Sequence, residues 1–192
     1  MSFQRNKTFI LIIIAVAALL VASPFLQQLA IAPQTEYFTE MALLDSNHKT
    51  DYPSNATSGK NYKLYIEITN HLGHAADYTV EAKFRDASQP GPDSFKHTSS
   101  SLPPLERFTV SADDNQTVEL PLEVSLQFSS SGYVDSLTIN GKTHNINTQI
   151  EFDSQKNNYY SNIFFELWVY NQTTNKLQYH ERYISLWLKM IT

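Results

Sequence analysis

The sequence contains no cysteine and only five glycines among its 192 residues. Without cysteine the chain has no disulfide, no thiolate metal ligand and no cysteine nucleophile. It also lacks a G-x-S-x-G motif and a glycine-rich phosphate-binding loop, which mark many hydrolases and nucleotide-binding enzymes. We therefore expect no catalytic residues, no enzyme activity and no cofactor.

Basic residues are fewer than acidic ones. The chain has 14 Lys and Arg residues against 19 Asp and Glu residues, which gives a formal net charge of −5. Arg5 and Lys7 precede a long apolar run, and every acidic residue follows it. Nucleic-acid binding requires a positive field along the phosphates. The acidic part after the run is therefore not expected to bind nucleic acid.

The apolar run predicts a membrane anchor. Residues 9–22 are all Phe, Ile, Leu, Ala or Val, and Phe25 and Leu26 extend the apolar segment. Its length of roughly 19 residues suits a helix that crosses the hydrocarbon core of a bilayer. We predict a transmembrane signal-anchor helix over residues 8–26, in contact with the lipid bilayer.

The charges flanking the predicted anchor set its orientation. Arg5 and Lys7 are expected to stay in the cytoplasm under the positive-inside rule. The prediction is therefore a cytoplasmic tail (residues 1–7), a juxtamembrane stem (residues 27–35) and an extracellular domain (residues 36–192). The chain is expected in the cell membrane as a single-pass protein.

A cleaved signal peptide is the alternative to an anchor. Such a peptide has the same basic start and apolar core, and Ala30-Ile31-Ala32 offers a cleavage pattern. Pro33 would directly follow that cut, however, and is expected to obstruct the peptidase. The uncleaved anchor is the favoured interpretation, and cleavage remains a matter for measurement.

Beyond the stem the pattern indicates strands. Apolar residues alternate at positions 62–68 and again at positions 78–84, as in strands with one buried face. Asn140-Gly141 and residues 171–176 predict hairpins, and residues 85–104, with four prolines, predict a long loop. Further strands are predicted at residues 38–44, 106–111, 116–120, 123–128, 136–139, 144–152, 163–170 and 177–188.

This succession of short strands predicts an all-β fold. We expect an immunoglobulin- or fibronectin-like β-sandwich ectodomain, preceded by one N-terminal transmembrane helix. The aromatic segments around Trp168 and Trp187 fit a central strand and the core. They also fit a second interpretation, an aromatic patch that faces a partner.

One group of residues resembles a metal site. His71, His74 and Asp77 could supply two imidazoles and a carboxylate to zinc or copper. The three residues surround a predicted turn, where such side chains also occur simply exposed to water. Three N-glycosylation sequons, at Asn55, Asn115 and Asn171, lie in predicted turns or loops of the outer part.

Several segments resemble an archaeal family known as domain of unknown function 1616. They are Tyr37-Phe-Thr-Glu40-Met-Ala-Leu-Leu44, Asp51-Tyr52-Pro53 with Gly59, Ile68-Thr-Asn70-His71, Asp77-Tyr78-Thr79-Val80-Glu81, Ser131-Gly132-Tyr133 and Arg182-Tyr183-Ile-Ser185-Leu-Trp187-Leu. The resemblance implies an archaeal membrane protein with an extracytoplasmic β domain and no established activity. Members of the family typically carry several N-terminal spans, whereas this chain has one, and residues 138–162 look inserted.

Two hypotheses of function follow. The first is a non-enzymatic interaction module, either an accessory subunit of a membrane complex or a cell-surface protein, whose partner is another membrane or envelope protein. The second is a metal-handling or catalytic ectodomain centred on His71 and His74. The anchor, the acidic exterior and the lack of a catalytic motif favour the first hypothesis.

Overall fold

The computed structural model describes Lys7, Ile10, residues 12–18 and residues 37–191. The chain divides into two units, Met1–Glu36 and Tyr37–Thr192. The described residues of the first unit are helical, and its described isoleucine and valine side chains are about half exposed.

The predicted anchor falls in this first unit. Within the described residues, no helix combines the length and the apolar character needed to span a bilayer. Most of the predicted anchor (residues 8–26) and of the tail (residues 1–7), and the whole stem (residues 27–35), lie outside the described residues. The anchor therefore stays a prediction.

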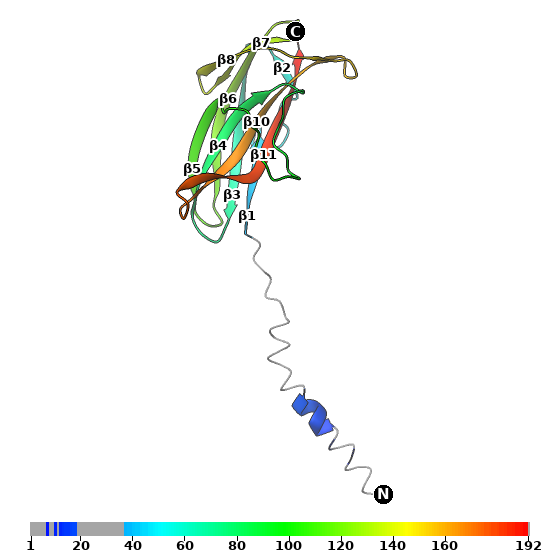
Figure 1. The fold of residues 1–192 in the computed structure, drawn as a ribbon, viewed down its shortest axis with the longest axis vertical. Coiled ribbons are helices and arrows are strands. Elements are labelled where there is room, and N and C mark those ends of the chain that lie inside the picture. Colours follow the sequence, from blue (N-terminus) through cyan, green and yellow to red (C-terminus); the bar gives the residue numbers. More distant parts are fainter. Residues whose placement is uncertain (1–6, 8–9, 11, 19–36, 192) are drawn as a thin grey trace. The chain divides into compact units, whose positions relative to one another are not determined.

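The second unit is built from strands, as predicted (Figure 1). Its strands are β1 (Phe38–Leu44), β2 (Asn55–Thr57), β3 (Asn61–His71), β4 (Ala76–Arg85), β5 (Glu106–Ala112), β6 (Thr117–Phe128), β7 (Tyr133–Ile139), β8 (Lys142–Gln149), β9 (Phe152–Asp153), β10 (Asn158–Asn171) and β11 (Lys176–Ile191).

The strands form two sheets. One has five strands in the order β1-β3-β6-β7-β8. The other has six, in the order β2-β11-β10-β4-β5, with β9 paired to β10. Neighbouring strands are antiparallel except for β2, which is parallel to β11.

This strand order is of the immunoglobulin type. In such sandwiches the first, second and fifth strands (A, B and E) share one sheet, and C, F and G share the other. Here β1, β3 and β6 take the places of A, B and E, and β4, β10 and β11 take those of C, F and G. The hairpin β7–β8 extends the first sheet beyond β6, on the side where strand D lies in immunoglobulin domains.

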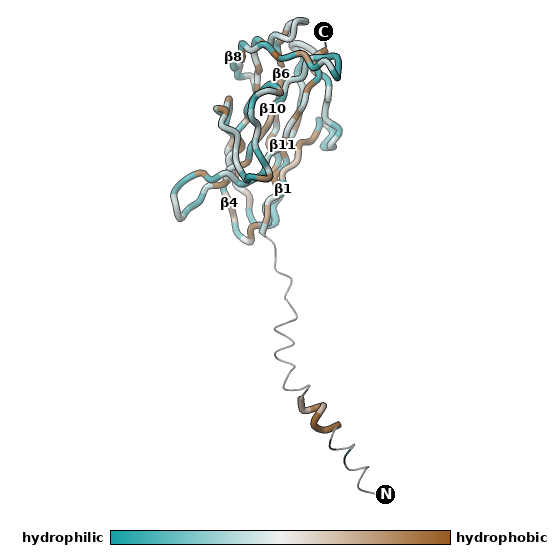
Figure 2. Tube along the Cα trace, turned by 45° about the vertical axis from the view of Figure 1, so that its right-hand side comes forward, coloured by the Kyte–Doolittle hydropathy of each residue, from teal (hydrophilic) through white to brown (hydrophobic). Residues whose placement is uncertain are grey.

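The core lies between the two sheets, as the period-two pattern requires. Alternate residues of β3 are buried, and so are the inward residues of β4 and β10. Hydrophilic residues gather in the loops at the ends of the domain (Figure 2). The largest fully buried apolar side chains of the core cluster are Leu64, Ile66, Ile68, Tyr78, Leu122, Leu126, Leu137, Ile139, Ile150, Ile163 and Phe165.

Both predicted hairpins are present. Asn140 and Gly141 connect β7 to β8 with φ of 48° and 79°, the left-handed pair that a type I′ turn requires. Residues 171–176 connect β10 to β11, with Asn171 opposite Lys176.

Apart from shifted strand ends, the largest being that of β10, which begins at Asn158 and not at residue 163, the structure departs from the predicted strands in three places. The short strand β2 (Asn55–Thr57) was not predicted. Two predicted strands are one continuous strand, β6, which passes through Pro121. β7 pairs with β6 only from Val124 onward, so Pro121 has a strand on one side only and its missing N–H is tolerated. The strand predicted over residues 144–152 is divided into β8 and β9.

Candidate functional site

Two of the predicted metal ligands lie at the turn between β3 and β4. The Nδ1 atom of His71 lies 3.0 Å from the side-chain oxygen of Asn115. The Nδ1 atom of His74 lies 2.9 Å from the carbonyl oxygen of Leu72, within its own turn. The two imidazoles thus have separate protein partners.

The third predicted ligand belongs to β4. Asp77 accepts a hydrogen bond from the hydroxyl of Ser111 on β5. Within the described residues, no group of three or more His, Asp and Glu side chains is placed to hold a metal ion. The structure therefore does not bring His71, His74 and Asp77 together as one ligand set.

The predicted glycosylation sites occupy three places on the domain. Asn55 is the exposed first residue of β2, and Asn115 is exposed in the β5–β6 turn. Asn171 ends β10, where its side-chain oxygen accepts hydrogen bonds from the backbone N–H groups of Thr173 and Thr174. Whether these sites carry glycans stays a prediction.

A different set of residues forms the most unusual polar site of the domain. Lys83 Nζ lies 2.7 Å from Oε2 of Glu166 and 3.2 Å from Oε2 of Glu81. Arg107 binds the other oxygen of Glu81 at 2.9 Å. The side chains of Lys83, Glu166 and Glu81 are only 3%, 0% and 7% exposed. We call these four residues the charge cluster.

The register of the six-stranded sheet assembles the charge cluster. Glu81 on β4 lies opposite Glu166 on β10 and opposite Arg107 on β5. Lys83 lies opposite Phe164 on β10, one pleat further along. Because alternate residues of a strand share a face, the cluster lies on the face of the sheet that points away from the core. Such a face is normally open to water.

The loop between β4 and β5, residues 86–105, covers this face (Figure 1, green, beside β11). The backbone N–H of Ser100 donates to Oε1 of Glu166 at 2.6 Å, and Lys83 Nζ donates to the carbonyl of Ser100 at 3.1 Å. The hydroxyl of Ser100 donates to the carbonyl of Pro90 at 2.9 Å. The loop therefore buries the cluster and also completes its hydrogen bonding, as buried charges require.

Arg85 fixes the start of this loop. Its guanidinium lies 5.8 Å from the ring centre of Phe164 and 5.1 Å from that of Trp187, within the range of cation–π contacts. Arg85 also donates to the side chain of Asn162 at 2.9 Å and to the carbonyl of Gln89 at 3.0 Å. Burial lowers the pKa of Arg85 from its ordinary value.

The tip of the loop presents an exposed aromatic ring. Asp93 and Thr98 exchange two backbone hydrogen bonds of 2.9 Å and 3.1 Å, which close a short hairpin. The carboxylate of Asp93 accepts from the backbone N–H of Phe95 and of Lys96. These backbone hydrogen bonds, led by that from Lys96, lower the pKa of Asp93. Phe95 is 95% exposed although its backbone is held in place.

A further contact ties the tip to the sheet. His97 Nδ1 lies 2.7 Å from a carboxylate oxygen of Glu181 on β11. Glu181 has φ of 57° and lies at the irregularity where the β10–β11 register shifts. The loop is thus attached at its base, at Ser100 and close to Phe95.

The aromatic residues Trp168 and Tyr179 lie next to the charge cluster. Trp168 is half-buried, with its ring centre 5.6 Å from that of Tyr179 and 6.0 Å from Lys83 Nζ. Burial, and then the nearby charge of Glu166, raises the pKa of Tyr179. Trp168 therefore lies on a central strand and lines the covered face, whereas Trp187 is 39% exposed under Arg85.

A second buried polar chain lies between the sheets. His180 Nε2 is 2.7 Å from the hydroxyl of Thr39, which lies 2.9 Å from the hydroxyl of Tyr78. Tyr78 in turn donates to the side-chain oxygen of Asn70 at 3.0 Å. Burial, followed by the charge of Arg182, lowers the pKa of His180. This chain joins strands of both sheets.

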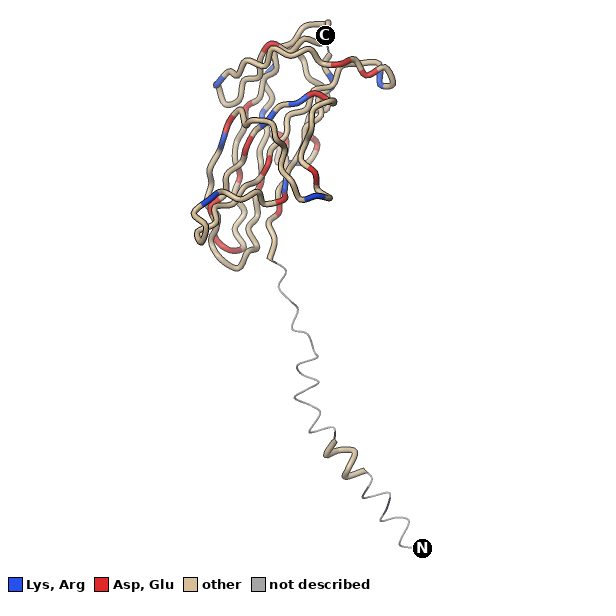
Figure 3. Tube along the Cα trace, in the orientation of Figure 1, with Lys and Arg blue, Asp and Glu red and all other residues tan. Residues whose placement is uncertain are grey.

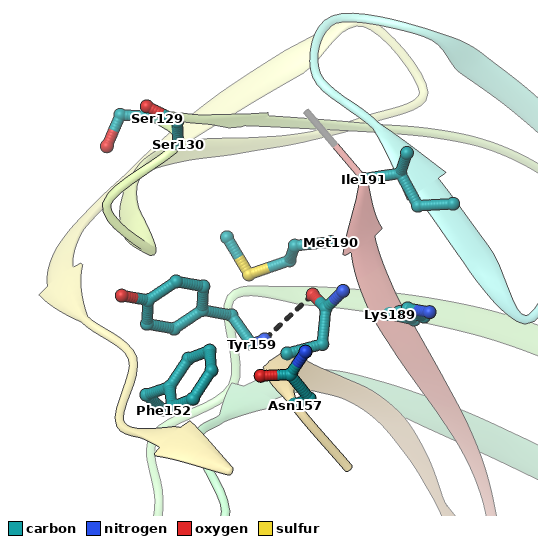
Figure 4. A pocket seen from close by; sticks show the side chains of 9 residues that line it. Ser129, Ser130, Phe152, Asn157, Tyr159, Lys189, Met190 and Ile191 are labelled. Carbon is teal, nitrogen blue, oxygen red and sulfur yellow. Dashed lines mark hydrogen bonds between the residues drawn. The ribbon is translucent and has the colours of Figure 1, made fainter. Parts of the chain in front are cut away.

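A shallow pocket lies near the end of β11 (Figure 4). It has a volume of about 280 Å³ and is bordered by the rings of Phe152 and Tyr159 and by the side chain of Met190. The two rings meet edge to face with centres 5.1 Å apart. Lys189 is the one charged residue among those that line this pocket, so the lining contains no ion pair like those of the charge cluster.

The strand pattern alone did not point to the charge cluster. Glu81, Lys83 and Glu166 were assigned to strands, and no contact among them was predicted. One signal was present in the sequence, because Glu166 stands within the apolar run Phe164-Phe-Glu-Leu-Trp168. A charge in the middle of a strand that is apolar on both faces needs a buried partner.

The fold and site define a two-sheet β domain of immunoglobulin-like strand order. A family model described as Domain of unknown function (DUF1616) matches residues 32–169. The chain therefore belongs to that family, as its sequence motifs predicted. No curated protein matches the chain.

Solved structures give weaker likenesses. The CARDB domain of a Pyrococcus furiosus protein, solved in complex with di-metal ions, has a TM-score of 0.38 at 8% identity, covering 80% of this chain and 90% of that one. A β-glucosidase from Listeria innocua, in complex with glucose, has a TM-score of 0.37 at 12% identity, covering 80% of this chain and 16% of that one. These scores are too low to support an argument, and the fold assignment rests on the strand order.

Proposed function

We propose that this chain is a non-enzymatic interaction protein of the membrane. Residues 8–26 anchor it in the bilayer, and the β domain lies outside the cell as an accessory subunit of a membrane complex or as a surface protein. Its partner is another membrane or envelope protein. The β4–β5 loop (residues 86–105) makes the contact.

The observation that carries this proposal is the exposure of Phe95 on a fixed backbone. An aromatic side chain removed from water contributes favourably in proportion to its buried area, so its exposure is costly in a free domain. The Asp93–Thr98 hairpin and the contact of His97 with Glu181 hold the backbone of the loop tip that carries the ring. Aromatic residues on ordered elements are typical anchors of protein–protein contacts.

The charge of the domain supports a protein partner over a lipid or nucleic acid surface. Acidic and basic residues are interspersed along the strands and loops (Figure 3), and acidic residues prevail. Such a surface is not attracted to anionic lipid or to phosphate backbones. A contact centred on one aromatic ring and bordered by both signs of charge suits a protein surface.

The proposal is tested with a photo-reactive phenylalanine analogue in the full chain. Placed at position 95, the analogue is expected to cross-link one defined species in the native membrane, and the chain should be extracted only by detergent. The matched control carries the analogue at position 152, where Phe152 is 46% exposed near the end of β11.

Phe95→Ala gives a second readout. It should abolish recovery of the same species after purification in mild detergent, while leaving the free energy of unfolding within about 0.5 kcal/mol of the original because the ring makes no buried contact. Equal cross-linking at positions 95 and 152, or an unchanged yield of the partner with Phe95→Ala, would contradict the proposal.

A further inference from the structure

The charge cluster holds the reacting groups of an amide bond in contact. The amine of Lys83 lies 2.7 Å from Oε2 of Glu166, and Oε2 of Glu81 lies 3.2 Å from the same amine. Arg107 occupies the other oxygen of Glu81, so that Oε2 is the atom turned toward Lys83. A nucleophile, an acyl group and a proton carrier thus meet in one buried site.

A fifth group completes this arrangement. The backbone N–H of Ser100 donates to Oε1 of Glu166 at 2.6 Å, on the oxygen that does not contact Lys83. A fixed N–H donor at that position stabilises the negative charge that develops on a carboxyl oxygen when a nucleophile adds to its carbon. We propose that Lys83 and Glu166 join in an intramolecular isopeptide bond, with Glu81 carrying the protons.

The chemistry balances without any added reagent. Lys83 passes one proton to Glu81, and the neutral amine adds to the side-chain carboxyl carbon of Glu166 to form a C–N bond. Oε1 carries the developing charge and is held by the N–H of Ser100. Oε2 then leaves as water, because it takes up the two protons that the nitrogen has lost, both of them relayed by Glu81. One ammonium and one carboxylate become one amide and one water.

Burial favours this reaction because charged groups are costly to remove from water. The product is a neutral amide, which ends the desolvation cost of the Lys83–Glu166 pair. The loop of residues 86–105 covers the site and limits the water needed for hydrolysis.

The position of the bond gives it a structural role. It connects β4 to β10, the two central strands of the six-stranded sheet, across 83 residues of sequence. The chain has no cysteine and therefore no disulfide to provide such a link. A covalent closure of this length restricts the unfolded chain in the manner of a disulfide.

Mass spectrometry of the full chain tests the proposal. The chain is produced in a host that does not glycosylate it, then denatured and weighed. We expect a mass lower than the sequence mass by one water. Trypsin should release residues 64–85 joined to residues 157–176, with no cleavage after Lys83, because an acylated lysine is not a trypsin site. The joined peptide separates this bond from water loss elsewhere in the chain.

Three variants locate the chemistry. Lys83→Arg and Glu166→Ala should each restore the full sequence mass, because the amine or the acyl group is missing. Glu81→Gln should leave most of the chain unlinked after the time in which the original chain reacts fully. An original chain that has the sequence mass and is cleaved after Lys83 overturns the proposal, and this readout does not depend on the folding of any variant. Water loss retained in Lys83→Arg would overturn it as well.

Discussion

The outward faces of the two sheets differ although the strands that build them alternate in the same way. On the five-stranded sheet, the outward residues of β3 and, apart from Ser125, those of β6 are exposed or half-buried, as in a sandwich that meets solvent. On the six-stranded sheet, Thr79, Glu81 and Lys83 of β4 and Glu166 of β10 are each 5% exposed or less when the whole residue is counted. The difference comes from the β4–β5 loop, which covers only the second sheet.

This contrast shows that the alternation of apolar residues predicts which face of a strand points into the core, but not whether the outward face is exposed or covered. A polar residue at an outward position is inexpensive in water and costly when a loop covers it. On the covered sheet each charge therefore needs a partner. Removing one partner of an ion pair is nearly harmless on the open sheet, but on the covered sheet it leaves an uncompensated buried charge.

The largest expected effect comes from removing the side chain of Lys83. Lys83→Ala leaves Glu81 and Glu166 buried with less compensation and also removes the proposed bond to Glu166, so it should lower the free energy of unfolding by about 3–5 kcal/mol or more. The matched change on the open sheet is Lys63→Ala, because Lys63 pairs with Glu123 at 3.5 Å with both side chains more than half exposed. It should cost less than about 1 kcal/mol. Denaturant titration followed by tryptophan fluorescence measures both, and equal losses would abolish the distinction between the two faces.

A smaller effect is expected at the contact between loop and sheet. Ser100→Ala removes the hydroxyl that donates to Pro90 and accepts from the backbone N–H of Leu102. It should cost about 1 kcal/mol and speed hydrogen exchange in residues 86–105. Ser101→Ala changes an exposed neighbour and should stay within about 0.5 kcal/mol of the original. Unchanged exchange in Ser100→Ala would show that this hydroxyl does not hold the loop.

The smallest effect concerns the polar chain between the sheets. Burial lowers the pKa of His180 below its ordinary value of 6.5, so the unfolded chain binds a proton there before the folded one does. Stability from this group is present above pH 6.5 and is lost as the pH falls toward the lowered folded pKa. The melting temperature of the original chain, measured by thermal unfolding, should therefore decrease as the pH is lowered from 7 to 5.

His180→Gln is the control for that pH dependence. It keeps a group able to bond Thr39 but does not titrate, so the fall in melting temperature between pH 7 and pH 5 should be smaller. The carboxyls whose pKa is lowered, such as Asp93 and Glu106, lose their contribution only at more acidic pH. An identical pH dependence in the variant would assign the effect to other groups.

Much of the β domain could be predicted from its sequence because the signals are local. The bounds of β1 and the Asn140-Gly141 turn follow from neighbouring residues, and so does the proline-rich loop of residues 86–105. The continuity of β6 through Pro121 could not be predicted, because it depends on where β7 stops pairing.

The candidate site was less predictable because its residues are distant in sequence. Lys83 and Glu166 are 83 residues apart, and Ser100 comes from a loop with no regular pattern. No spacing rule relates such residues before the strands are paired. His71, His74 and Asp77 show the converse case. They are close together in the sequence and were therefore predicted as one site, but each has a separate partner in the structure.

The same long separations bear on how fast the domain reaches its native state. β2 pairs with β11, which places Asn55 beside Lys189, and β4 pairs with β10, which places Glu81 beside Glu166. Domains dominated by such non-local pairings fold on the order of milliseconds to seconds, because loop closure costs entropy before the contacts repay it. The covered face can form only after β10 has paired with β4. Until then Glu166 is exposed to water, and the loop of residues 86–105 has no sheet surface to pack against.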